Sequence, residues 1–150
     1  PILKPIRAFS DSRGYSFFDI FGEPTSGQIN IGNLAGDAVK AFHYHKLQWD
    51  HWFCLKGDIH IILVKEKENP VVTFGELLHQ DNYDIRHYYI GEHNPCVLSI
   101  PPNWWHGYCN ISRDSTLLYW VTKAYNPNEV DEYRKPWDCF GRWLWLPENK

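Results

Sequence analysis

Short segments of alternating polarity, each closed by turn-forming residues, most strongly constrain how this chain of 150 residues folds. Successive side chains of a strand point to opposite faces, so apolar–polar alternation is typical of a half-buried strand. No stretch keeps the i, i+3, i+4, i+7 apolar spacing of an amphipathic helix over a normal helix length. Strands are therefore predicted over residues 14–21, 28–34, 39–45, 51–55, 59–65, 85–90, 96–100 and 116–121.

Gly, Pro, Asn and Asp separate these segments, and short strands joined by such turns indicate an antiparallel sandwich or barrel. A charged turn is predicted over residues 65–70, whereas residues 71–80 fit either a strand or a short helical turn. From residue 126 onward the chain is irregular and rich in Pro, Trp and charge, so we expect it to pack across a barrel face or a neighbouring subunit. The length predicts one domain over residues 1–150.

Composition excludes several classes of partner. The formal net charge of −3 offers no basic surface for nucleic acid, and no apolar run is long enough to span a membrane. The 4 cysteines are scattered without a C-x-x-C pair, and no signal segment opens the chain, so we expect reduced thiols in a cytoplasmic protein. Aromatic residues make up 17% of the chain, and this surplus together with the sheet edges predicts a homodimer.

Two histidines one residue apart form the first chemical motif. His43 and His45 share a face of their predicted strand because side chains alternate. Asp50 on the next strand and His106 far downstream stand at spacings that bring them to the same point. Three imidazoles and a carboxylate inside a barrel fit either a metal site or an acid–base site.

The second motif surrounds His106, where Pro101 fixes a turn before a strand that begins by aiming the imidazole inward. Together the two motifs resemble those of the cupin superfamily, with Asp50 in place of the usual glutamate and Asn103 in place of a glycine. The resemblance implies an all-β, antiparallel cupin jelly-roll barrel with an irregular C-terminal extension. Cupins host many activities, so the motifs identify the fold better than the chemistry.

A closer resemblance covers nearly the whole chain. Five segments are similar, in order, to motifs of the dTDP-4-dehydrorhamnose 3,5-epimerases, namely residues 9–15, 28–30, 40–44, 100–108 and 119–127, and the run over residues 131–134 then follows in family order. The resemblance implies that His43 is the general base, which removes the proton beside a 4-keto group, and that Tyr119 is the general acid on the opposite face of the sugar. A neutral imidazole and a phenol suit these two roles.

The same resemblance implies most of the substrate contacts. It assigns nucleotide-diphosphate contacts to Arg13 and Gln28 and pocket positions to His106 and Tyr125, and it places Lys40 where the family has an arginine near the substrate.

Three further residues are added to the predicted site. Trp104 is predicted to line the pocket for a flat or sugar-like ligand. His45 stands where the family has glutamine, and we expect it to help shape the proton route. The family pairs its base with an aspartate near the end of a longer C-terminus, so Asp50 is the candidate to orient His43 or His45 here.

Three functions fit these residues. The first is a nucleotide-sugar epimerase or ketoisomerase acting on a 4-keto-6-deoxy sugar nucleotide, dTDP-linked or similar, without a cofactor. The second is a metal-dependent cupin, an oxygenase or isomerase, with a divalent metal held by His43, His45, Asp50 and His106. The third is a non-catalytic sugar-binding cupin. Residues 119–125 and the pair Arg13 and Gln28 favour the first.

Overall fold

The computed structural model describes residues 1–69 and 80–147, which are almost entirely strand and connecting loop. Within these ranges there is no α-helix, only the 3₁₀ turns η1 (Gln80–Asn82) and η2 (Arg142–Trp145). The strands are β1 (Ile2–Pro5), β2 (Phe9–Asp11), β3 (Gly14–Ser16), β4 (Gln28–Ala35), β5 (Val39–Tyr44), β6 (Asp50–Lys56), β7 (Asp58–Glu66), β8 (Tyr83–Gly91), β9 (Cys96–Ile100), β10 (Trp105–Asn110), β11 (Asp114–Val121) and β12 (Tyr133–Arg134).

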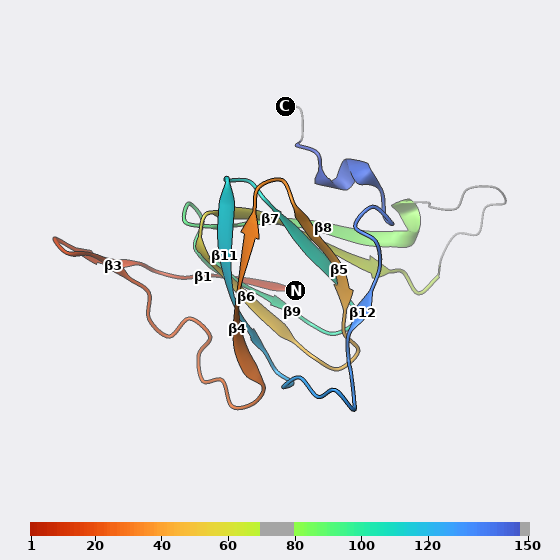
Figure 1. The fold of residues 1–150 in the computed structure, drawn as a ribbon, viewed down its shortest axis with the longest axis horizontal. Coiled ribbons are helices and arrows are strands. Elements are labelled where there is room, and N and C mark those ends of the chain that lie inside the picture. Colours follow the sequence, from red (N-terminus) through yellow and green to blue (C-terminus); the bar gives the residue numbers. More distant parts are fainter. Residues whose placement is uncertain (70–79, 148–150) are drawn as a thin grey trace.

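Ten of these strands form two antiparallel sheets that enclose the core (Figure 1). One sheet has the order β1-β9-β6-β11-β4 and the other the order β12-β5-β10-β7-β8. Strands that are distant in sequence lie side by side, as when β10 pairs with both β5 and β7. The predicted all-β antiparallel barrel is confirmed.

The period of two along β6 decides what faces the barrel interior. Trp52 and Cys54 are buried in the main core, together with residues of the opposite sheet such as Ile61 and Leu63. His51 points to the outer face, where its ring stacks on Trp120 with the centroids 4.5 Å apart. Asp50 lies at the interior end of the same row, so a carboxylate is carried into the barrel by the alternation that buries the tryptophan.

The C-terminal extension packs against the second sheet, as predicted. Phe140 and Leu144 are buried in a separate apolar cluster with Phe42 of β5. The rings of Phe42 and Phe140 meet edge to face with their centroids 4.9 Å apart. This packing anchors the chain beyond β12 and holds β12 against β5.

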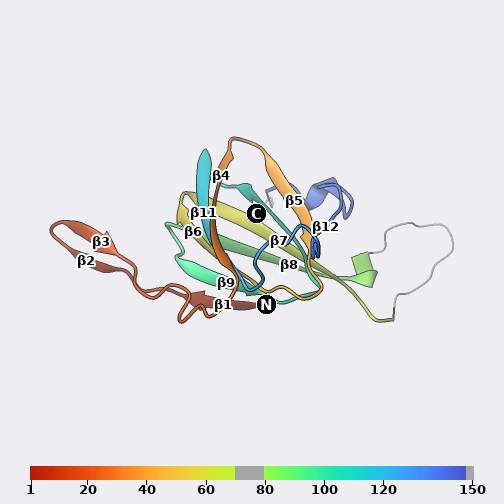
Figure 2. The same ribbon diagram turned by 60° about the horizontal axis from the view of Figure 1, so that its bottom comes forward.

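A hairpin formed by β2 and β3 projects from the barrel (Figures 1 and 2). Its side chains are exposed, and Phe9 and Tyr15 keep 53% and 61% of their surface in contact with solvent. Just after the hairpin, Phe17 returns to the barrel and packs edge to face on Phe53. An exposed apolar projection of this kind is typical of a contact surface.

Most predicted strands match observed ones within two residues, but three predictions need comment. The strand predicted over residues 14–21 ends at Ser16, because Phe17 and the residues after it turn back to cover the outer sheet face. The turn predicted over residues 65–70 begins later, since β7 continues to Glu66. Residues 70–79, which include most of the ambiguous segment 71–80, lie outside the described residues.

All four cysteines carry unpaired thiols, in agreement with the sequence. Burial raises the pKa of the Cys54 thiol to about 12 and makes it an inert core residue. In the part of the chain that the structure describes, no helix is long and apolar enough to cross a membrane.

Candidate active site

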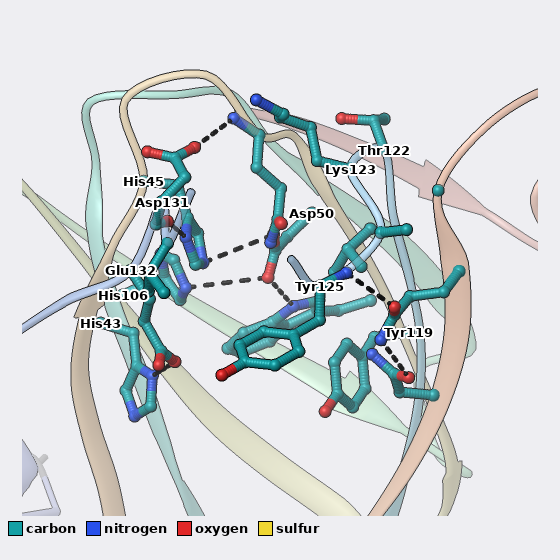
Figure 3. A pocket seen from close by; sticks show the side chains of 18 of the residues that line it. His43, His45, Asp50, His106, Tyr119, Thr122, Lys123, Tyr125, Asp131 and Glu132 are labelled. Carbon is teal, nitrogen blue, oxygen red and sulfur yellow. Dashed lines mark hydrogen bonds and ion pairs between the residues drawn. The ribbon is translucent and has the colours of Figure 1, made fainter. Parts of the chain in front are cut away.

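A cavity of about 630 Å³ lies within the barrel and is lined by strands of both large sheets. The segment that runs from Thr122 to Glu132 lines part of its mouth (Figure 3). The volume lies within the range of small-molecule sites, roughly 300–1,000 Å³. Cations and anions share the lining, which includes Lys40, Lys123, Arg134, Asp50, Glu129, Asp131 and Glu132.

His43 on β5 is paired with a carboxylate. Its Nδ1 lies 2.9 Å from Oε1 of Glu132, and because a carboxylate only accepts, the imidazole nitrogen is the donor. Burial lowers the pKa of His43 while the bond to Glu132 acts to raise it, and the net direction is downward. Burial acts to raise the pKa of Glu132, but the hydrogen bonds from His43 and Arg134 outweigh it and lower that pKa. These two directions indicate a neutral imidazole on His43 beside an ionised carboxylate on Glu132.

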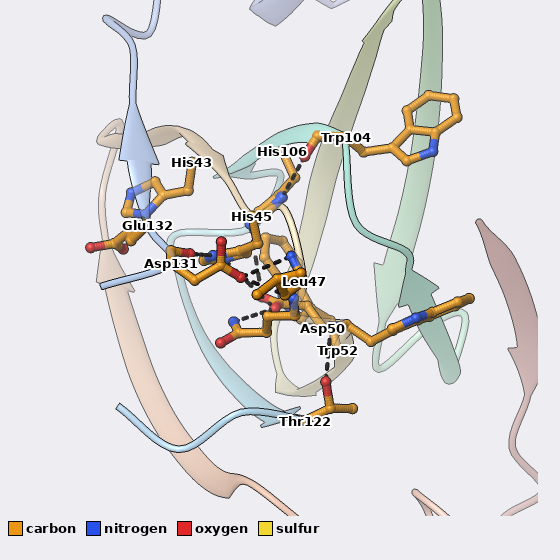
Figure 4. Close-up of polar contacts among 12 residues, drawn as sticks. His43, His45, Leu47, Asp50, Trp52, Trp104, His106, Thr122, Asp131 and Glu132 are labelled. Carbon is orange, nitrogen blue, oxygen red and sulfur yellow. Dashed lines mark hydrogen bonds and ion pairs between the residues drawn. The ribbon is translucent and has the colours of Figure 1, made fainter. Parts of the chain in front are cut away.

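His45, His106 and Asp50 form a buried cluster next to His43 (Figure 4). Nε2 of His45 lies 3.7 Å from Oδ1 of Asp50, and Nε2 of His106 lies 3.7 Å from Oδ2. The carboxylate is oriented by Gln48, whose Nε2 donates to Oδ1, and by Trp52, whose Nε1 donates to Oδ2. Asp50 thus faces His45 and His106, while His43 is hydrogen-bonded to a different carboxylate, that of Glu132.

Backbone carbonyls determine the tautomers of both clustered histidines. Nδ1 of His45 donates to the carbonyl of Asp131, and Nδ1 of His106 donates to the carbonyl of Trp104. Each Nε2 is then without a proton in the neutral ring and turns its lone pair toward Asp50. Burial lowers the pKa of His106 despite the raising effect of Asp50, which favours the neutral ring. The two Nε2 atoms and the Asp50 carboxylate are therefore three hydrogen-bond acceptors that face one another.

Asp131 ties the cavity-lining segment to the turn before β6. Its carboxylate accepts hydrogen bonds from the backbone N–H groups of Lys46, Leu47 and Gln48, at 2.9, 2.9 and 3.0 Å. The same residue offers its carbonyl to His45. One residue thus fixes both the loop that follows His45 and the ring of His45 itself.

Asn103 takes the place of the glycine in the second cupin motif, and the backbone conformation there favours glycine or asparagine. Its φ is 69°, in the left-handed region that asparagine tolerates better than other non-glycine residues. Its N–H donates to the carbonyl of His45, and its Oδ1 accepts from the Tyr44 hydroxyl at 2.8 Å. The departure from the motif preserves the turn that precedes His106.

Tyr119 lies on β11, in the sheet opposite the one that carries His43. Figure 3 shows the two side chains on opposite sides of the cavity. Burial raises the pKa of Tyr119, as does the charge of Asp50, so the phenol keeps its proton. A Cβ on Gly32 would lie 3.9 Å both from Nζ of Lys40 and from Cε1 of Tyr119, so both side chains border Gly32 of β4, and both line the cavity.

Gln28 and Tyr125 both line the cavity and are joined to each other. Oε1 of Gln28 accepts from the backbone N–H of Tyr125 at 2.9 Å, and Nε2 of Gln28 donates to Asn30. The Tyr125 side chain remains 70% exposed over the opening. Its ring is available to pack against a ligand.

Two predicted contacts lie away from the cavity. Arg13 is in the turn of the projecting hairpin, where its guanidinium pairs with Asp11 and is 87% exposed. Trp104 is a core residue with the Arg86 guanidinium 4.9 Å above its ring, so the expectation that it lines the pocket is wrong. Figure 4 shows its indole turned away from the histidine cluster, and its backbone carbonyl accepts the hydrogen bond from Nδ1 of His106.

Sequence reasoning missed Glu132 and Asp131, which contact His43 and His45. Both acids stand in a segment with an irregular sequence, about 90 positions after the histidines. No periodicity connects that segment with the strand of the histidines. The available signal was the run Asp131-Glu132-Tyr133-Arg134, which follows family order in the resemblance but carried no assigned role.

The polysaccharide biosynthesis C-terminal domain family matches residues 9–133, which include every strand from β2 to β11. The chain belongs to this family. One relative is the spore coat polysaccharide biosynthesis protein SpsL of Bacillus subtilis strain 168, which is 34% identical over 142 residues. These residues make up 91% of this chain and 87% of that protein. Another is the probable low-salt glycan biosynthesis epimerase Agl13 of Haloferax volcanii, 37% identical over 102 residues, 67% of this chain and 60% of that protein.

The fold of this family member is shared with a solved dTDP sugar isomerase of Desulfovibrio desulfuricans G20. The two superpose with a TM-score of 0.76 at 19% identity, over 99% of this chain and 92% of the isomerase. At this identity the likeness establishes the fold. Together with the family match, it confirms the cupin barrel and the resemblance to dTDP-sugar epimerase-like cupins.

Proposed function

We propose that this protein is a nucleotide-sugar epimerase or ketoisomerase that acts on a 4-keto-6-deoxy sugar linked to dTDP or a similar nucleotide. One observation carries the proposal. An imidazole on β5 and a phenol on β11 face one cavity from opposite sheets. Inverting a carbon requires a proton to leave from one face of the sugar and to return on the other, which is the arrangement that two opposed groups provide.

The chemistry follows from the protonation states. Nε2 of His43 removes the proton on a carbon beside the ketone, and the electron pair of the broken C–H bond forms an enolate. Tyr119, which keeps its proton because burial raises its pKa, donates that proton to the opposite face. The Lys40 ammonium, which also lines the cavity, offsets negative charge on the enolate or on the phosphates.

The relatives support the substrate class. SpsL and Agl13 are named for polysaccharide and glycan biosynthesis, and the isomerase with the shared fold is named for a dTDP sugar. The cavity lining offers Lys40, Lys123 and Arg134 as partners for phosphate oxygens. Unpaired thiols favour a reducing compartment, so we place the reaction in the cytoplasm.

Deuterium exchange tests the proposal. Incubation with dTDP-4-keto-6-deoxyglucose in D₂O should introduce deuterium beside the ketone, detected by NMR as loss of the C3 or C5 proton signal. His43→Ala should abolish the exchange and leave the melting temperature near that of the wild type. Unchanged exchange in this variant would remove His43 as the base. A wild-type protein that binds dTDP- and UDP-linked ketosugars without exchange would instead be a non-catalytic sugar-binding cupin.

A metal-dependent reaction is the second candidate, favoured by the buried cluster. One ligand atom each from His45, Asp50 and His106 lies within 4.8 Å of the other two, and His43 stands outside this group. Two imidazoles and a carboxylate, with both Nδ1 positions held by carbonyls, fit Zn²⁺, Fe²⁺ or Mn²⁺. Such an ion would polarise a substrate carbonyl.

Elemental analysis of the purified protein tests this candidate. The expected result is about one metal ion per chain in the wild type, and its loss in His106→Ala. His51→Gln, which changes a histidine on the outer sheet face, is the matched control and should retain the ion. Substoichiometric metal in the wild type would reject the candidate.

We also propose a homodimer. Ile29 and Ile31 of the edge strand β4 are 54% and 67% exposed, and the hairpin carries further exposed apolar residues. A second copy would cover these side chains. Arg13 projects on the hairpin, so the phosphate contact that the motifs imply for it would be made in the partner's cavity.

A further inference from the structure

Of the described residues that line the cavity, three are histidines, and one of these has an anionic partner on Nδ1. His45 and His106 donate to backbone carbonyls, which are neutral. His43 donates to the Glu132 carboxylate at 2.9 Å. An anion stabilises the imidazolium that forms when a base takes a proton, and it does so far better than a neutral carbonyl.

The Glu132 carboxylate is itself held on both sides. Its Oε1 meets His43, and its Oε2 accepts from Nη2 of Arg134 at 3.1 Å. The backbone around it is fixed because β12 pairs with β5, with Arg134 opposite His43. Both oxygens are therefore engaged within the protein, and the group is preorganised rather than recruited by the substrate.

Other charged groups around His43 do not take this role. Lys40 on β5 and Arg134 on β12 are cations, and both act to lower the pKa of His43. Asp50 on β6 is oriented toward Nε2 of His45 and of His106. The neighbouring ring of His106 on β10 lies 6.3 Å from that of His43, centroid to centroid, and is bonded to a carbonyl.

We propose that Glu132 is the positioning residue of the base. It holds His43 as the Nδ1–H tautomer, keeps the Nε2 lone pair available to the cavity, and stabilises the imidazolium that forms during proton abstraction. This inference rests on the proposed function of His43. When the C–H bond of the substrate breaks, the proton joins Nε2 and the electron pair stays on the enolate. The Nδ1 proton remains on the ring and Glu132 remains a carboxylate.

The first measurement concerns the tautomer and needs no substrate. Long-range ¹H–¹⁵N correlation spectra of ¹⁵N-histidine-labelled protein distinguish a protonated from an unprotonated ring nitrogen. The His43 signals are identified by their loss in His43→Asn. The wild type should show Nδ1 protonated and Nε2 bare, whereas Glu132→Ala should move the ring toward the opposite tautomer. Nε2–H as the main form in the wild type would overturn the proposal.

The second measurement separates charge from geometry in the exchange assay. Glu132→Gln keeps an oxygen that accepts from Nδ1 but removes the charge, so kcat should fall at least about tenfold, and at most by the roughly 10²–10⁴-fold that a general base contributes. KM should change less than about threefold, because neither Glu132 oxygen is free for substrate. Glu132→Asp should restore part of kcat. Wild-type kcat in Glu132→Gln would refute the role.

Glu23→Gln is the matched control, since it makes the same chemical change in an exposed loop outside the cavity lining. It should leave both kinetic constants and the His43 spectrum unchanged. Melting temperatures of all variants exclude unfolding as the cause of lost activity. If the wild type shows no exchange, the proposed function fails, while the tautomer spectra still decide whether Glu132 positions His43.

Discussion

Hydrogen-bond partners, rather than residue type, separate the histidines of this cavity. His43, His45 and His106 share a small volume, yet one meets a carboxylate and two meet carbonyls at Nδ1. Their Nε2 atoms also differ in surroundings, since two of them face Asp50 at 3.7 Å. The same side chain therefore suits proton abstraction at one position and cation or hydrogen-bond chemistry at the other two.

Tyr119→Phe should separate the two halves of the reaction. The phenyl ring preserves packing but supplies no proton on the side opposite His43. Deprotonation by His43 should continue, so deuterium exchange should persist, while epimerised product should fall by roughly 10²–10⁴-fold. NMR of one reaction mixture in D₂O reports both quantities. Tyr89→Phe on β8, outside the cavity lining, should behave as the wild type. Equal loss of exchange and product would assign another role to Tyr119.

At the scale of elements, the segment before β12 organises the site. Asp131 binds the turn after His45, and Glu132 binds His43. Two successive residues therefore hold one histidine within β5 and the turn after the histidine that follows its end. Short antiparallel pairing of β12 with β5 supports both contacts. This segment, which reads as irregular in sequence, is a structural part of the candidate active site.

Asp131→Asn should destabilise the protein in a pH-dependent way. Burial acts to raise the pKa of Asp131, but three backbone N–H groups outweigh it and lower the pKa below the usual 3.8. The ionised carboxylate thus stabilises the fold above that value, and the contribution is lost as pH falls through the lower folded value. Near pH 7 the variant should lose roughly 1–3 kcal/mol of unfolding free energy.

Urea unfolding of both proteins near pH 7 and near pH 3 measures this effect, because the difference between them should shrink at the acidic value. Asp37→Asn, an exposed turn position, should stay within about 0.5 kcal/mol of the wild type. A difference that is the same at both pH values would show that the Asp131 carboxylate charge does not support the turn.

At the scale of the molecule, the exposed apolar surface predicts self-association. Size-exclusion chromatography with light scattering should give the wild type twice the mass of one chain. Ile31→Glu places a charge on the exposed face of β4 and should give a single-chain mass, because a buried unpaired charge opposes association. Leu146→Glu, at a position 65% exposed in the C-terminal extension, should remain dimeric. A monomeric wild type would contradict the prediction.

Several features of the molecule were readable from local pattern. Alternation along β4, β6 and β11 predicted those strands within two residues, because half-burial of a sheet imposes a period of two on the sequence. The same rule placed His43 and His45 on one face and Asp50 with Trp52 on another inward row. The short β12 and the end of the strand predicted over residues 14–21 were not readable, since packing against other segments decides them.

By itself the sequence determined the all-β barrel and brought His43, His45, Asp50, His106 and Tyr119 into consideration, because strand periodicity and motif order are local properties of the chain. Only the tertiary structure decided which groups meet. It joined His43 to Glu132 across 89 positions, turned Asp50 toward the other two histidines, and buried Trp104 in the core. Hydrogen bonds between segments far apart in sequence depend on how the sheets pack, and no local pattern encodes that packing.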